Sequence, residues 1–189
     1  MAEPRKPIRP DKVNIPKTFH SFSSKAPFKN CLFCEKDLMK TTAPYVIEKA
    51  FKQYQGYRAK DVVFEYAICM DCAENMRNSM SGESLARIDA YVSSNMDMQE
   101  RFDELQYKEE FILDDYIGHC MVKGTAMEQC GEYQIVGLCS QGKLLLTNSP
   151  YMLSGAALDE IADLLSNKTI DEIDRFKDQY FSPPPEFED

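Results

Sequence analysis

Two CxxC pairs constrain this chain more than any other feature of its sequence. Cys31 and Cys34 form the first pair, and Cys69 and Cys72 form the second. A two-residue spacer lets one tight turn present both sulfurs to the same ion, so two such pairs can surround one metal with four thiolates. The spacing therefore predicts a single zinc ion held by all four cysteines.

Such a site is expected to be structural. Four protein thiolates fill a tetrahedron and leave no position for a water molecule or a substrate, so the zinc contributes folding energy rather than catalysis. A rubredoxin-like iron centre also uses two thiolate pairs, but Glu35 and Ala73 follow the pairs where glycines would favour that centre. A thioredoxin-like redox pair is disfavoured because it needs a βαβ setting.

The residues between the pairs predict a β-hairpin. Residues 45–47 and 62–68 are rich in β-branched and aromatic side chains, and Gly56 lies in the polar connection between them. The stretch 73–80, directly after the second pair, has helix-forming character. A ligand turn, a hairpin and a ligand pair at a helix start resemble a treble-clef zinc finger over residues 31–80. This resemblance identifies no specific family.

The rest of the chain predicts an α+β protein with further parts. An apolar stripe predicts a helical connector over 81–115, and its members recur at helical spacing: Leu85, Ile88, Val92 and Met96. Residues 116–189 predict a separate α+β domain with a hairpin (133–139 and 143–147), two closing helices and an acidic Pro-rich tail. Residues 1–30 predict a flexible, basic, Pro-rich arm. We find no internal repeat in the sequence.

Two further residue groups are candidate sites. A second metal site is one interpretation of a set without CxxC spacing, although cysteines packed in the core are the simpler interpretation: His119, Cys120, Cys130 and Cys139. Contacts to an anion are expected, on the nucleic-acid hypothesis, from four basic residues of the hairpin region: Lys49, Lys52, Arg58 and Lys60.

The leading functional hypothesis is a non-catalytic interaction or regulatory protein with one structural zinc. The chain has no P-loop, GxGxxG, HExxH or GxSxG motif, which disfavours an enzyme. One alternative is a nucleic-acid-binding protein that uses the basic N-terminal region, although the net charge of the whole chain is -9. Another is an enzyme with a site near His119 and Cys120. We expect a protein partner, no membrane partner and a cytoplasmic location.

Overall fold

The computed structural model describes residues 10–54, 56–57 and 59–181, and it combines helices with an antiparallel sheet. The predicted α+β class is confirmed. The strands are β1 (Lys12–Asn14), β2 (Tyr45–Gln53), β3 (Lys60–Cys69), β4 (Glu132–Ser140), β5 (Lys143–Leu145) and β6 (Tyr151–Ser154). The helices are α1 (Met70–Ser79), α2 (Gly82–Asn95), α3 (Met98–Gln106), α4 (Leu113–Ile117), α5 (Gly155–Ala162) and α6 (Asn167–Phe181), and two short 3₁₀ turns span Lys17–Phe19 and Met127–Gln129.

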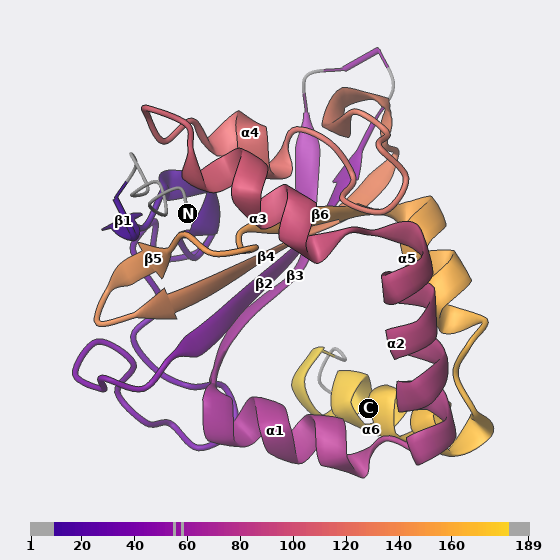
Figure 1. Cartoon of the computed structure of the whole chain (residues 1–189). Coiled ribbons are helices and arrows are strands. Elements are labelled where there is room, and N and C mark those ends of the chain that lie inside the picture. Colours follow the sequence, from indigo (N-terminus) through magenta and orange to yellow (C-terminus); the bar gives the residue numbers. More distant parts are fainter. Residues whose placement is uncertain (1–9, 55, 58, 182–189) are drawn as a thin grey trace, which may run out of the picture.

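All six strands belong to one sheet (Figure 1). Its order is β1-β5-β4-β2-β3, and β6 also pairs with β4. Strand β4 lies antiparallel beside β2, with Tyr45 opposite Cys139 and Lys52 opposite Glu132. The sequence placed these two strands in separate domains, and this boundary is wrong. A two-stranded hairpin is only marginally stable in water, so the β2–β3 hairpin gains a partner by pairing with β4.

The sheet buries one face through strict alternation. Every second side chain of β2 is buried from its start onward, namely Tyr45, Ile47, Lys49 and Phe51. Ile47 of β2 and Ile135 of β4 are fully buried and lie at the centre of the core. The opposite face packs against α6, where the rings of Phe64 and Tyr66 meet that of Phe181.

The N-terminal segment is built into this core from residue 11 onward. Strand β1 pairs with β5, and the ring of Phe19 is completely buried. The prediction of a flexible arm over 1–30 is therefore wrong for residues 11–30. The prolines of this segment were the reason to expect an extended arm. Instead, the ring of Phe19 packs against Gly137, where a Cβ would lie only 2.9 Å from the ring. Residues 1–9 and the predicted acidic tail over 182–189 lie outside the described residues.

The helices surround the sheet on both sides. Figure 1 shows α1, α2, α5 and α6 on one side and α3 and α4 on the other. The helical connector predicted over 81–115 contains α2 and α3, but the chain between Gln106 and Leu113 is not helical. Ser81 caps α2 by accepting a hydrogen bond from the amide of Ser84, as expected for a serine at this position. None of the helices in the described part of the chain has the length and apolar character that a membrane span requires.

Candidate metal centre

The four cysteines of the CxxC pairs converge at one end of the sheet. Their Sγ atoms all lie within 4.8 Å of one another, and those of Cys34 and Cys69 are 3.7 Å apart. Cys31 and Cys34 stand in the tight turn that precedes β2, Cys69 is the last residue of β3, and Cys72 lies in the first turn of α1. Cys31 and Cys69 are buried, whereas Cys34 is exposed.

The turn that carries the first pair is closed by backbone hydrogen bonds. The amide of Cys31 donates to the carbonyl of Lys36 at 2.9 Å, and the amide of Glu35 donates to the carbonyl of Cys31 at 3.0 Å. Glu35 has a φ of 57°, the left-handed conformation that lets the chain reverse within so few residues. A further hydrogen bond from Leu32 to the carbonyl of Ala67 attaches the turn to β3.

The second pair is positioned by the junction of a strand and a helix. Cys69 occupies the cap position of α1, so its backbone is still extended while Cys72 is already helical. The amide of Cys69 donates to Sγ of Cys31 at 3.3 Å. Lys36 of the first turn pairs with Asp71 of α1 at 2.7 Å, which adds a second link between the two ligand pairs.

The environment of the thiols favours anionic sulfur at one of them. Burial opposes ionisation of Cys31, but the amides of Cys34, Cys69 and Phe33 outweigh it and lower the pKa of this thiol to about 7. Burial raises the pKa of Cys69 and of Cys72, and hydrogen bonds from the other three thiols raise the pKa of Cys72 further. Four thiols in such proximity cannot all ionise without a cation, because like charges at this distance repel.

The spacing of the sulfurs suits a bound metal ion. A tetrahedral ion with metal–sulfur bonds of about 2.3 Å requires sulfurs about 3.8 Å apart, and Cys34 and Cys69 meet this distance before any metal is present. Across the residues that the structure describes, this is the only group of three or more potential ligands within binding distance. The four cysteines can therefore hold one metal ion.

The second set of candidate ligands does not form a metal site, because its members point to different partners. His119 is exposed, Cys130 donates to the carbonyl of Ala126, and Cys120 accepts hydrogen bonds from Ser154. Cys139 is fully buried in β4, where the strand alternation turns it into the core beside Tyr45. The simpler interpretation of core cysteines describes this region.

Of the basic residues proposed to contact an anion, Lys49 is unavailable for that role. Lys49 is 4% exposed, because its position in β2 points into the core, and it pairs with Glu65. Lys52 is exposed and pairs with Glu132, while Lys60 donates to the hydroxyl of Tyr133. Arg58 lies outside the described residues. The prediction is therefore wrong for Lys49.

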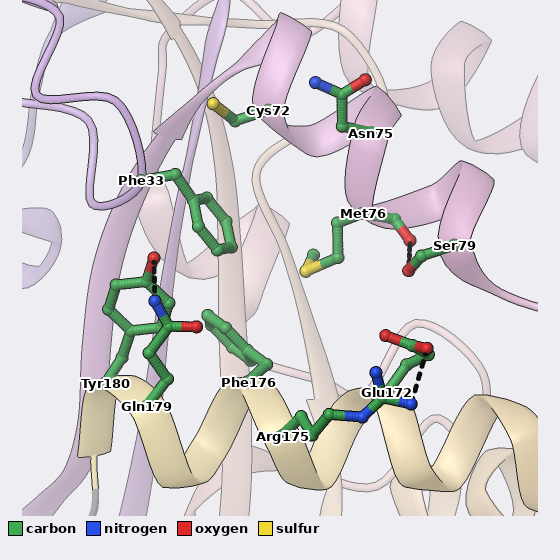
Figure 2. A pocket seen from close by; sticks show the side chains of 10 residues that line it. All are labelled: Phe33, Cys72, Asn75, Met76, Ser79, Glu172, Arg175, Phe176, Gln179 and Tyr180. Atoms are coloured by element: carbon green, nitrogen blue, oxygen red, sulfur yellow. Dashed lines mark hydrogen bonds and ion pairs between the residues drawn. The ribbon is translucent and has the colours of Figure 1, made fainter.

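A groove of about 410 Å³ lies directly beside the metal centre (Figure 2). Its apolar walls come from the ligand turn, α1 and α6, and include Phe33, Met76, Phe176 and Tyr180. Figure 2 shows the side chains of Phe33, Met76 and Phe176 pointing toward one another across it. The ion pair of Arg175 with Glu172, 2.9 Å long, lies at its rim. The sequence did not predict this groove, although the aromatic spacing of Phe176 and Tyr180 is a signal for an apolar face on α6.

No protein-family model, no curated protein and no solved structure matches this chain. Its class is therefore defined by the fold and the site alone. It is an α+β protein in which an antiparallel sheet and a following helix bring four cysteines into one potential metal centre.

Proposed function

We propose that this protein is a non-catalytic, zinc-stabilised interaction protein. The observation that carries the proposal is the closed set of four cysteine sulfurs, which fits one tetrahedral zinc ion. The ligand turn, the β2–β3 hairpin and the ligand pair at the start of α1 form a treble-clef-like arrangement around that ion. Thiolate ligands require reduced cysteines, so we place the protein in a reducing compartment such as the cytoplasm.

The zinc is structural in this proposal because its four ligands leave no open position. Catalytic zinc sites have three protein ligands and a water molecule. The ion instead joins the ligand turn to the junction of β3 and α1, two segments that are distant in sequence. Its binding energy becomes folding energy in this part of the molecule.

Cobalt substitution tests the closed site. Co²⁺ in place of zinc is expected to give the absorption of a tetrahedral tetrathiolate complex, and this spectrum is expected to stay unchanged when azide or imidazole is added. A spectrum that shifts with either ligand reveals an open coordination position and overturns the non-catalytic role.

The groove beside the metal is the recognition surface in this proposal. Phe33 lies between the ligands Cys31 and Cys34, and Met76 lies one helical turn after Cys72. The metal therefore fixes two of the three elements that line the groove. An apolar floor with a charged rim suits an apolar anchor residue of a protein partner.

Matched variants test this surface. Met76→Asp introduces a charge into the groove, whereas Met98→Asp changes an exposed methionine at the start of α3. We expect proteins captured from native extract by the wild type to be retained by Met98→Asp and lost both by Met76→Asp and by metal-depleted protein. Equal capture by all four samples contradicts a role for the groove.

A further inference from the structure

The turn that carries Cys31 recurs around Cys120 with the same hydrogen bonds. Cys31 donates to the carbonyl of Lys36 at 2.9 Å, and Cys120 donates to that of Thr125 at 2.8 Å. Two more backbone hydrogen bonds occur at the same positions in both turns. In the first turn the amide of Glu35 donates to the carbonyl of Cys31, and that of Leu38 to Lys29. In the second turn the amide of Gly124 donates to the carbonyl of Cys120, and that of Met127 to Gly118. Glu35 and Gly124 both have positive φ values, 57° and 66°.

Both turns are attached in the same way to a strand that leads into a helix. Leu32 donates to the carbonyl of Ala67 in β3, and Met121 donates to that of Met152 in β6. Two residues further along, each strand reaches the cap of the next helix. The amide of this cap residue donates to a cysteine sulfur of the turn. Cys69 donates to Sγ of Cys31 at 3.3 Å, and Ser154 donates to Sγ of Cys120 at 3.2 Å.

An approximate twofold axis in the sheet relates two sets of elements, one that begins with the Cys31 turn and one that begins with the Cys120 turn. Ala67 lies opposite Ile47, and its counterpart Met152 lies opposite Ile135. Strands β2 and β4, which thus correspond, pair with each other in an antiparallel manner. The axis passes through the pair of Glu48 and Val136, because the corresponding residues Ile47 and Ile135 lie on either side of this pair.

The second helices of the two sets meet through reciprocal hydrogen bonds. Ser81 donates its amide to the hydroxyl of Thr169 at 2.9 Å, and Ser166 donates its amide to that of Ser84 at 2.8 Å. The hydroxyls of Ser81 and Ser166 bond to each other at 2.8 Å. Such a self-exchanging pair is expected where a twofold axis passes.

We infer that residues 118–181 are a second copy of the unit at 29–95, and that this copy has lost its metal site by substitution of three ligands. Cys31 corresponds to Cys120, which is retained. The other three ligands correspond to residues that cannot bind zinc as thiolates do: Cys34 to Lys123, Cys69 to Ser154 and Cys72 to Ala157. This inference rests on the proposed zinc site only for the identity of the metal.

Local contacts take the place of the metal in the second copy. Sγ of Cys120 accepts hydrogen bonds from both the amide and the hydroxyl of Ser154, at 3.2 and 3.3 Å, and from the amide of Lys123 at 3.4 Å. Lys123 also pairs with Glu160 of α5. These bonds join the turn to the helix, which is the task that zinc performs in the first copy. The molecule is thus a single-chain pseudo-dimer with one metal site.

Restoring the three ligands tests the inference. The variant Lys123→Cys/Ser154→Cys/Ala157→Cys is expected to bind about one more zinc ion per chain than the wild type does, through four thiolates. The readout is the difference between variant and wild type, so it remains informative even if the wild type binds no metal and the proposed function fails. A folded variant with no gain in metal overturns the inference.

A milder variant keeps the test decisive if the buried Ala157→Cys change prevents folding. Lys123→Cys/Ser154→Cys leaves Ala157 in place and is expected to bind an additional Cd²⁺ with the ultraviolet absorption of three thiolates. Thr125→Cys/Ser154→Cys adds the same number of thiols at the wrong spacing and is expected to show no such gain. Equal cadmium binding by the two double variants contradicts the inference.

Discussion

The Nζ atom of Lys49 lies 2.9 Å from a carboxylate oxygen of Glu65, and both side chains are largely shielded from solvent. Lys49 also donates to the carbonyl of His20, and Glu65 accepts from the amide and hydroxyl groups of Phe22 and Ser21. The ion pair therefore connects β2 and β3 to the N-terminal segment. The charge of Lys49 is tolerated in the core because its ammonium group has an ion-pair partner and a hydrogen-bond acceptor there.

Replacing Lys49 by methionine is expected to lower the free energy of unfolding by about 3–5 kcal/mol, because Glu65 would keep a buried charge without its partner. Urea denaturation measures the loss. Lys52→Met is the control, since Lys52 is half exposed and its pair with Glu132 is expected to contribute about 1 kcal/mol or less. Similar losses in the two variants contradict a buried role for Lys49.

Gly137 is expected to tolerate no side chain. A Cβ there would lie 2.9 Å from the ring of Phe19 and 3.0 Å from Leu144. Gly137→Ala should therefore cost about 1–3 kcal/mol of stability through overpacking. Gly131→Ala is the matched control, because no atom lies within 4 Å of a Cβ at that position. Thermal denaturation of both variants gives the comparison, and an unchanged Gly137→Ala would show that Phe19 does not pack there.

The buried carboxyl of Glu48 makes stability depend on pH. Burial raises its pKa, although the hydroxyl of Tyr66 and the amide of Gln134 donate to it at 2.5 and 2.7 Å. A raised pKa in the folded state means that this group's contribution is complete below the ordinary glutamate pKa and is lost as the pH rises through the folded value. Glu48→Gln should therefore gain stability relative to the wild type as the pH increases.

Chemical denaturation between pH 5 and pH 8 measures this difference. The exposed Glu110→Gln is the control and is expected to follow the wild type at every pH. A constant offset between Glu48→Gln and the wild type across the range would show that Glu48 ionises normally.

Loss of one metal ligand is expected to remove the metal and destabilise the protein. Cys34 is exposed, so Cys34→Ser disturbs little packing and reports mainly on the metal. After dialysis against a chelator its zinc content should fall from about one per chain to near zero, since three thiolates hold the ion more weakly than the closed set of four. Cys130→Ser is the control, because Cys130 belongs to no ligand group, and elemental analysis of both variants gives the result. Zinc retained by Cys34→Ser argues against the site.

The sequence predicted that the four cysteines converge, because the signal of the CxxC pairs is local. The spacing of Cys31 and Cys34 fixes a turn geometry, whichever fold surrounds it. The burial of Lys49 could also have been predicted from the sequence, since Tyr45, Ile47 and Phe51 share its side of the strand. The single sheet could not have been predicted, because the pairing of β2 with β4 depends on contacts between segments that are distant in sequence. Strands β1 and β6 are too short to show an alternating pattern.

The internal duplication escaped the sequence for a different reason. Its two copies share backbone hydrogen bonds more than side chains, and three of the four metal ligands differ between them. Glu35 and Gly124 adopt the same conformation with different residues. A repeat of this kind is visible in the hydrogen-bond pattern, where the reciprocal contacts of Ser81 and Ser166 identify its axis.

X-ray absorption spectroscopy at the zinc edge of the purified protein identifies the ligands of the proposed zinc ion. A closed four-cysteine site should give one zinc per chain with a single shell of four sulfur atoms at about 2.3 Å. A shell that contains nitrogen or oxygen, or a protein that carries no zinc when purified under reducing conditions, would contradict the closed four-cysteine site.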